Sequence, residues 1–511
     1  MSNAAQAVWD HASSTPDRVA LRGDGEPWTY ARLRERAAAV AGRLRDAGIA
    51  PGDRVLLVAP SVPEFAGAYY GILASGAVAV TANTMSTIPE LEYAGTDAGV
   101  KLVLAWHEVT TAASGAAASL GVPCWTITDG LADIASADPA EPQALHPADP
   151  DDNAVILYTS GTTGHPKGAQ LTHGNLTACA EIFLEVLEFE PTDRFGTALP
   201  LFHVFGQAVV MGTTMLAGAS LSLLSRFDAA GLLDLLRRDQ LTVMAGVPTM
   251  WNALLHAPAG ADDAADFASL RLAASGGAAM PAEVMRAFEQ RFGCVILEGY
   301  GLSETAGAAT FNGLHRERKA SCVGIALPRC EVEVRGDDGA ERPTGEIGEI
   351  FIRGPVVMSG YWNRPEATAE VLQDGWLRTG DLGTEDADGD IRIVDRSKDL
   401  IIRGGYNVYP REVEEVLYEH PDIVEVAVVG VPDEHFGEEV AAVLALRPGA
   451  ELHADELRSW AKERLSAYKV PRLFQVVDTL PKGPTGKILK RAIDPAAIRA
   501  AAAASTTGAG Q

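Results

Sequence analysis

The chain has 511 residues, of which 47% are hydrophobic and 22% charged, so it can bury large cores and a wholly disordered protein is excluded. At about 150 residues per domain, this length indicates two to four domains. The net charge of −26 excludes a general nucleic-acid binder, which needs a basic surface. The five cysteines form no CxxC pair, so the sequence supports neither a zinc cluster nor a disulfide framework. No signal-peptide pattern opens the chain, and we expect a cytoplasmic protein.

Helical and strand patterns alternate through the first 110 residues. Apolar positions at helical spacing predict a helix that begins at Thr29 and ends at Gly48, before a short buried strand at residues 54–59. A second helix at residues 63–75 and a strand at residues 77–80 follow. Similar strands recur at residues 101–105, 241–246 and 294–297. This order predicts an α/β fold with a parallel sheet covered by helices.

One stretch requires a membrane test. Residues 195–225 contain no Asp, Glu, Lys or Arg and are numerous enough to span a bilayer. Pro200, His203 and Gln207 interrupt the stretch, however, and its pattern is that of a strand end, a turn, a helix at residues 207–216 and another strand. We therefore expect a buried element beside a ligand pocket rather than a transmembrane segment.

The pattern changes in the last third of the chain. Short alternating strands predict a small β-rich subdomain, at residues 331–335, 349–353 and 390–394. A compact α+β unit follows, with helices and strands at residues 410–418, 423–429, 439–446, 455–465 and 473–477. We predict a large N-terminal domain at residues 1–396, a small C-terminal domain at residues 397–491 and a disordered Ala-rich tail at residues 492–511.

The segment from Tyr158 to Gly168 combines hydroxyl residues, three glycines and a lysine directly after a buried strand at residues 154–157. Backbone N–H groups and hydroxyls in such a loop form a cradle for phosphate oxygens, and we expect a helix after it. A mobile linker is the alternative, which the preceding strand disfavours. The loop is not a Walker A motif, because Lys167 is followed by Gly168 rather than Ser or Thr.

This loop resembles the AMP-binding signature of the adenylate-forming superfamily, which includes acyl-CoA synthetases, carrier-protein-loading adenylation domains and luciferases. Other motifs of the superfamily follow in the right order: Pro200-Leu-Phe-His203, Gly299-Tyr-Gly-Leu-Ser-Glu-Thr305, Thr379-Gly-Asp-Leu382, Asp395-Arg-Ser-Lys-Asp-Leu-Ile-Ile402, Gly404-Gly-Tyr-Asn407 and Pro481 to Lys487. The resemblance covers residues 10–491. It implies that the small C-terminal domain is mobile and that the protein uses ATP, Mg²⁺ and coenzyme A.

The resemblance also implies a nucleotide site. Its residues would be Thr159, Ser160, Gly161, Thr162, Thr163, Gly164, Lys167, Gly299, Tyr300, Gly301, Ser303, Asp381, Ile393 and Arg396. Within this set Tyr300 would stack on adenine, while Asp381 and Arg396 would bind the ribose hydroxyls. Glu304 and Thr159 would hold Mg²⁺ on the ATP phosphates, since Mg²⁺ prefers oxygen ligands.

The catalytic residues implied by the resemblance are Lys487, His203 and Glu304. Lys487 would reach from the small domain to the substrate carboxylate and the α-phosphate, where a cation stabilises the developing charge. His203 would be the gate over the acyl site, with a satisfied core histidine as the alternative. Lys398 would be the hinge about which the small domain rotates, after which Gly404 and Gly405 would line the tunnel for CoA.

The expected acyl pocket consists of small, apolar or uncharged residues: Val204, Phe205, Gln207, Trp251, Ser275, Gly276 and Gly277. A second substrate carboxylate would therefore lack a partner. We predict an acyl-CoA ligase that activates a carboxylic acid, with a medium- or long-chain fatty acid favoured, as acyl-AMP with release of pyrophosphate, and then transfers the acyl group to CoA. The alternatives are a cinnamate-type aryl acid, or transfer to a carrier protein or an amine. A homodimer is compatible with the sequence.

Overall fold

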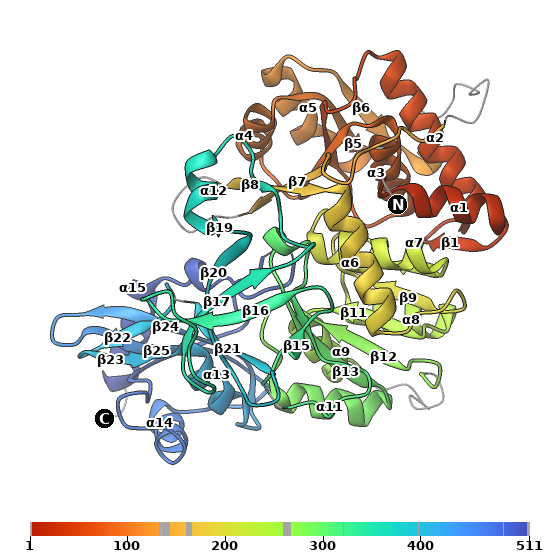
Figure 1. Cartoon of the computed structure of the whole chain (residues 1–511). Coiled ribbons are helices and arrows are strands. Elements are labelled where there is room, and N and C mark those ends of the chain that lie inside the picture. Colours follow the sequence, from red (N-terminus) through yellow and green to blue (C-terminus); the bar gives the residue numbers. More distant parts are fainter. Residues whose placement is uncertain are drawn as a thin grey trace.

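The computed structural model describes residues 3–131, 134, 144–159, 166–258, 267–319, 321–396, 398–483 and 485–507. The expected parallel sheet is present, and two mostly parallel sheets stand side by side in the N-terminal two thirds of the chain (Figure 1). Both have helices packed on them, which confirms the α/β fold predicted from the alternating pattern.

The first sheet has seven strands in the order β18-β8-β7-β4-β3-β5-β6. They are β3 (Arg54–Val58), β4 (Val78–Ala82), β5 (Val100–Trp106), β6 (Cys124–Ile127), β7 (Asn153–Thr159), β8 (Lys167–Thr172) and β18 (Gly360–Tyr361). The strands from β7 to β6 run parallel, whereas β8 and β18 are antiparallel to their neighbours. A strand rather than the expected helix thus follows the Tyr158–Gly168 loop, and helix α6 (His173–Val186) begins only after β8.

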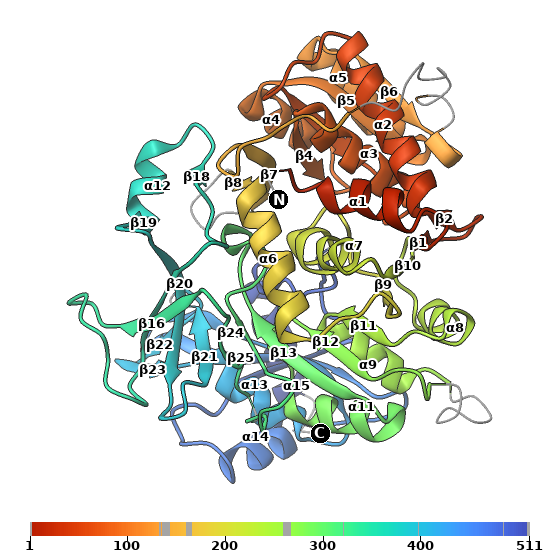
Figure 2. The ribbon, with the colours of Figure 1, turned by 45° about the vertical axis from the view of Figure 1, so that its right-hand side comes forward.

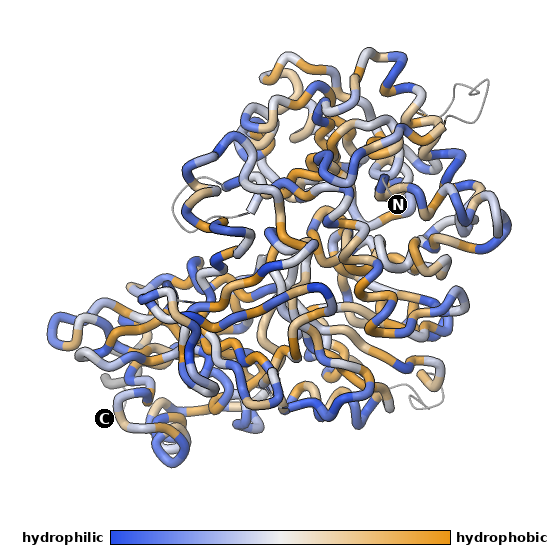
Figure 3. The backbone as a smooth tube through the Cα atoms, in the orientation of Figure 1, coloured by the Kyte–Doolittle hydropathy of each residue, from blue (hydrophilic) through white to orange (hydrophobic). Residues whose placement is uncertain are grey.

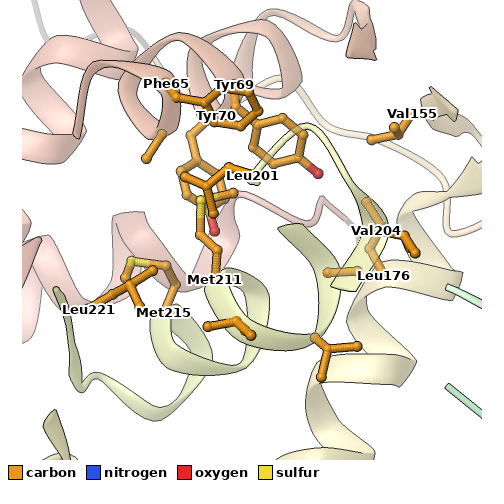
Figure 4. Packing of buried hydrophobic residues seen from close by; sticks show 14 of the residues in the cluster. Phe65, Tyr69, Tyr70, Val155, Leu176, Leu201, Val204, Met211, Met215 and Leu221 are labelled. Carbon is orange, nitrogen blue, oxygen red and sulfur yellow. The ribbon is translucent and has the colours of Figure 1, made fainter. Parts of the chain in front are cut away.

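Alternate side chains of β3 enter two different cores, as the period of two in a strand requires. Val55 and Leu57 face α2 (Tyr30–Asp46) and α3 (Pro63–Ser75), whereas Leu56 and Val58 face α4 (Ile88–Ala98) and α5 (Thr110–Leu120). Pro63 begins α3 and Gly76 ends it with φ +83°, a left-handed conformation that glycine adopts without strain. Figure 4 shows aromatic residues of α3 packed near Leu201 and Met211.

The second sheet has nine strands in the order β15-β14-β13-β12-β11-β9-β10-β1-β2, parallel from β1 to β13 (Figure 2). They are β1 (Val19–Arg22), β2 (Trp28–Thr29), β9 (Arg194–Thr197), β10 (Ser220–Leu223), β11 (Val243–Gly246), β12 (Leu272–Ser275), β13 (Val295–Tyr300), β14 (Thr310–Phe311) and β15 (Ile325–Ala326). Helices α8 (Ala229–Asp239), α9 (Pro248–His256) and α11 (Ala282–Phe292) share a core with it.

The uncharged stretch forms a turn, the π-helix η3 (Phe205–Gly212), the short helix α7 (Thr213–Ala217) and β10. The helix predicted at residues 207–216 is therefore present, but with π geometry in its first part. Among the described residues, every helix is too short or too polar to cross a bilayer. Figure 3 shows hydrophobic residues concentrated along the strands inside the molecule.

The β-rich subdomain is a five-stranded sheet next to helix α12 (Pro365–Val371). Its strands are β16 (Glu331–Arg335), β17 (Gly348–Arg353), β19 (Leu372–Gln373), β20 (Trp376–Glu385) and β21 (Ile391–Arg396). The α+β unit that follows has its own hydrophobic core. Its elements are β22 (Ile401–Arg403), β23 (Tyr406–Val408), α13 (Pro410–Tyr418), β24 (Ile423–Asp433), β25 (Gly437–Leu446), α14 (Ala454–Lys462) and β26 (Leu473–Val477). A domain boundary between residues 396 and 397 stays a prediction.

The tail differs from the expected disorder. Residues Pro495–Thr507 form helix α15, and Ile498 is fully buried against the C-terminal sheet. Alanine is the strongest helix former, so a run of alanines extends a helix once one apolar residue anchors it. Residues 508–511 lie outside the described part of the chain.

Candidate active site

Lys487 lies at the carboxyl edge of the nine-stranded sheet, against Gly277 just after β12. A β-carbon on Gly277 would lie only 2.8 Å from Cε and 3.2 Å from Nζ of Lys487. The preceding residue is held by Thr249 at the start of α9, whose hydroxyl donates a 2.8 Å hydrogen bond to the carbonyl oxygen of Gly486. The structure thus brings a C-terminal lysine to the strand ends where α/β sheets bind ligands.

Burial lowers the pKa of Lys487 to about 8; the nearby Arg396 lowers it further, and Asp381 opposes the shift. His203 lies in the same site, since burial and then the charge of Lys487 lower the pKa of its imidazole to about 3. Its Nδ1 accepts a 3.3 Å hydrogen bond from the backbone of Phe205. At neutral pH the Lys487 cation therefore lies near an uncharged imidazole.

Three residues of the predicted nucleotide site meet beside this lysine. The hydroxyl of Tyr300 donates a 2.6 Å hydrogen bond to Asp381, and Nε of Arg396 lies 3.3 Å from the other carboxylate oxygen. Asp381 and Arg396 are directly paired across β20 and β21, which explains why residues 15 positions apart share a site. Burial raises the pKa of the Asp381 carboxyl. A buried carboxylate of this kind can accept hydrogen bonds from a sugar.

Glu304 lies in the 3₁₀ turn η4 (Ser303–Thr305), and its Oε1 accepts a 2.9 Å hydrogen bond from Tyr361 of β18. Burial raises the pKa of this carboxyl. Nζ of Lys167 lies 5.1 Å from the centre of the Tyr361 ring. The carboxylate of Glu304, with the hydroxyl of Thr159, offers the hard oxygen ligands that suit Mg²⁺ on a triphosphate.

Of the predicted phosphate loop, Ser160, Gly161, Thr162, Thr163 and Gly164 lie outside the described residues. Its two flanks are described: Thr159 and Lys167 are direct partners across the antiparallel pair β7–β8. The two described flanks of the loop therefore lie side by side on paired antiparallel strands.

Two predicted glycines are required by packing. A β-carbon on Gly299 would lie 2.3 Å from the Phe311 ring, and one on Gly301 would lie 2.3 Å from the backbone of Ala308. Both positions need glycine whether or not a nucleotide is bound.

The expected acyl-pocket residues are only partly brought together. The ring of Phe205 would lie 3.3 Å from a β-carbon on Gly276, the residue between Ser275 and Gly277 at the end of β12. Val204 and Val209, of the same segment as Phe205, lie against Gly307.

Two members of the predicted set lie elsewhere. Gln207 is buried, and its amide donates to the carbonyl oxygen of Leu201. Trp251 is fully buried 5.2 Å from the Phe288 ring, in a core cluster that does not include Phe205, so it does not line this group.

The remaining predicted residues are placed as follows. Ile393 of β21 offers its carbonyl oxygen to Nη1 of Arg411 at 2.8 Å. Lys398 lies just after β21, where partial desolvation and then the charge of Arg396 lower the pKa of its amine. Gly404 and Gly405 form the turn between β22 and β23 with φ +58° and +84°, and open space surrounds Gly405.

Sequence reasoning missed Tyr361 and Arg411, and also the contact of Thr249 with Gly486. Arg411 donates through its backbone N–H to Asp395 at 3.0 Å and thereby attaches α13 to the residue before Arg396. The contacts of Tyr361 and Thr249 join segments far apart in sequence, and the chemistry of a single residue gives no signal of any of the three contacts.

Comparisons with known proteins agree with this geometry. Residues 8–362 match the AMP-binding enzyme family, and residues 412–487 match the AMP-binding enzyme C-terminal domain. The chain is 40% identical over 496 residues to feruloyl-CoA synthase from Amycolatopsis sp, covering 96% of this chain and 98% of that protein. It is 36% identical to a long-chain-fatty-acid–CoA ligase from Bacillus subtilis (strain 168), covering 94% and 92%. ATP-bound MatB from Rhodopseudomonas palustris superposes with a TM-score of 0.90 at 35% identity, and the match covers 96% of this chain and 98% of that structure's chain.

Proposed function

Because the chain belongs to the AMP-binding enzyme family, we propose that it is a CoA ligase for an apolar monocarboxylic acid, in the first place a cinnamate-type aryl acid. It is an acid–thiol ligase that uses ATP and CoA with an acyl or aryl acid. The single observation that carries the catalytic part of the proposal is the position of Lys487 against Gly277, beside His203 and Asp381.

In the first half-reaction a carboxylate oxygen attacks the α-phosphorus of ATP, the bond to the bridging oxygen of the β-phosphate breaks, and pyrophosphate leaves. A general base is unnecessary, because a free carboxylic acid is already ionised at pH 7. Lys487 stabilises the negative charge that builds on the phosphorus oxygens. Mg²⁺, held by Glu304 and Thr159, would neutralise charge on the phosphates.

In the second half-reaction the CoA thiol gives its proton to solvent and its sulfur attacks the carbonyl carbon of acyl-AMP. The bond from that carbon to the phosphate oxygen breaks, and AMP leaves with the bonding pair. Lys398 is the proposed hinge between the two arrangements, because it lies directly after β21 and before the C-terminal unit. The turn of Gly404 and Gly405 is the proposed CoA tunnel. The open space around Gly405 supports this role, because a pantetheine chain needs close access to backbone.

The shape of the acyl site favours a flat acid. The ring of Phe205 packs directly on Gly276, so an aromatic ring and glycine backbone together form one wall of the proposed site, on which a planar acid can lie. The 40% identity to feruloyl-CoA synthase supports the same class. A medium- or long-chain fatty acid is the second candidate, supported by the apolar side chains of Val204 and Val209 and by the 36% identity to a fatty-acid ligase.

The test is mass spectrometry of products from a mixed pool of C2–C18 fatty, benzoic, cinnamic and ferulic acids with ATP and Mg²⁺, with and without CoA. We expect a CoA-dependent thioester of an aryl propenoic acid, and its loss in Lys487→Ala. Accumulation of a fatty acyl-CoA instead would overturn the assignment of an aryl acid as substrate, but it would still support CoA ligase activity. Acyl-AMP that accumulates irrespective of CoA would overturn the CoA assignment and point to a carrier protein or an amine as acceptor.

A further inference from the structure

Asp97, at the end of helix α4, connects this helix to two other segments of the chain. Tyr158 donates a 2.8 Å hydrogen bond to its Oδ2, and Nη2 of Arg364 donates a 2.6 Å hydrogen bond to its Oδ1. The backbone carbonyl oxygen of Asp97 accepts a 3.0 Å hydrogen bond from the indole of Trp362. Only 10% of the Asp97 side chain is exposed, so these contacts hold it in one orientation.

The first segment is the base of the phosphate loop. Tyr158 directly precedes Thr159, the last residue of β7. Tyr93, one helical turn before Asp97, donates a 2.9 Å hydrogen bond to the carbonyl oxygen of Pro166, the residue before β8 begins. Residues four apart lie on the same face of a helix, so α4 holds the chain entering the loop and the chain leaving it.

The second segment, residues 361–364, contacts Glu304, the proposed magnesium ligand. Trp362 donates its backbone N–H to the carbonyl oxygen of Gly168 at 2.8 Å, which fixes residues 361–364 to β8. Tyr361, next to Trp362, holds Oε1 of Glu304. Asp97 therefore anchors, through Arg364 and Trp362, the segment that orients the carboxylate of Glu304.

We propose that Asp97 is a positioning residue for the ATP triphosphate: its carboxylate sets the distance between the flanks of the phosphate loop and Tyr361–Glu304 without touching the nucleotide. This inference rests on the proposed function. An ionised hydrogen-bond acceptor holds two donors at once more strongly than a neutral amide does, so loss of the charge loosens both sides together. Such misplacement weakens nucleotide binding, while the later transfer from acyl-AMP to CoA involves no triphosphate.

The chain offers a matched control in Asp193, a buried aspartate with 7% of its side chain exposed. It also pairs with an arginine, Arg271 at 2.8 Å, and accepts from a hydroxyl, that of Thr242 at 2.7 Å. Its partners belong to the nine-stranded sheet, at β9, β11 and the start of β12. Substitution of either aspartate by asparagine removes the same kind of interaction, but only Asp97 is connected to the phosphate loop.

The experiment compares Asp97→Asn, Asp193→Asn and the unsubstituted chain by calorimetric titration with MgATP and by thermal unfolding. We expect a rise of at least tenfold in the Kd for MgATP in Asp97→Asn, with transfer from supplied acyl-AMP to CoA unchanged, and an unchanged Kd in Asp193→Asn even if its Tm falls. If Asp97→Asn does not fold, Tyr158→Phe replaces it, because this variant removes only the hydroxyl that binds Asp97 from the side of the loop. We expect a several-fold rise in its Kd for MgATP. An unchanged Kd in both the Asp97 and Tyr158 variants, or an equal rise in Asp193→Asn, would overturn the inference. Failure of the unsubstituted chain to form acyl-CoA would instead overturn the proposed function, because the Kd for MgATP is read without turnover.

Discussion

Thr249, at the start of α9, donates a 2.8 Å hydrogen bond to the carbonyl oxygen of Gly486, the residue directly before Lys487. Nearby on the same helix, Asn252 donates to the carbonyl oxygen of Val424 at 3.0 Å. Two neutral side chains of α9 therefore hold the C-terminal unit in the pose that delivers Lys487. Such bonds contribute about 0.5–1.5 kcal/mol each, which is enough to bias a pose without locking it.

Thr249→Val, which keeps the shape and removes the hydroxyl, should slow acyl-AMP formation by roughly 3- to 10-fold, the equivalent of one neutral hydrogen bond. Transfer from supplied acyl-AMP to CoA should stay unchanged, because Lys487 acts in the first step. Rapid-quench measurement of both half-reactions separates the two. An equal loss in both steps would show that Thr249 stabilises the fold rather than the pose.

Gly277→Ala should abolish most adenylation, because its β-carbon would lie 2.8 Å from Cε of Lys487 and displace that side chain. Gly339→Ala is the matched control: it has φ +76° against +81° at Gly277, but no atom within 4 Å of its β-carbon. Both variants lose about 1–2 kcal/mol of stability from the left-handed backbone. Pyrophosphate release assays should show a large loss only for Gly277→Ala, and equal rates would contradict the placement of Lys487.

The pH profile of kcat/KM for ATP should fall above about pH 8, where Lys487 loses its proton, since the pKa of its amine is lowered to about 8. The sign follows from the role of the cation: deprotonation removes the charge that stabilises the phosphorus oxygens. His203, with a pKa of about 3, stays neutral and adds no limb at neutral pH. Lys487→Arg retains its charge throughout, so its slower reaction should lack the basic limb. A basic limb that persists in this variant would assign it to another group.

Tyr361→Phe should raise the Mg²⁺ concentration needed for half-maximal adenylation by about 10-fold, because a hydrogen bond to a charged group contributes about 1.5–3 kcal/mol. The variant removes the 2.9 Å bond that orients Glu304 and leaves the aromatic ring beside Lys167. Titration of Mg²⁺ at saturating ATP measures the shift, with Tyr406→Phe, an exposed tyrosine on β23, as control. An unchanged Mg²⁺ requirement would contradict the proposed role of Glu304 as a Mg²⁺ ligand.

The sequence predicts the parts of this site whose chemistry is carried within one short segment. Alternation of helical and strand patterns predicts a parallel sheet covered by helices, and Asp381 meets Arg396 because β20 and β21 are neighbours along the chain. The contact of Tyr300 with Asp381 is expected only from the resemblance to the superfamily. The contacts of Asp97 and Tyr361 could not be predicted from the sequence, because they depend on the pairing of β18 with β8, nearly 200 residues earlier. No local sequence pattern indicates such a pairing. Trp251 was expected in the acyl pocket but packs in a core with Phe288. An aromatic residue near a motif carries no information about which face of α9 it occupies.

The π-helix of residues Phe205–Gly212 has a consequence for how the acyl site can change. A π-helix accommodates one residue more than an α-helix of the same number of turns, and such segments are rare outside functional sites. Deletion of a single residue there would allow the backbone to return to α geometry, and the flanking segments would keep their relative orientation because the same turns would hold one residue fewer. The length of this segment could thus change by one residue while Phe205 still faces Gly276.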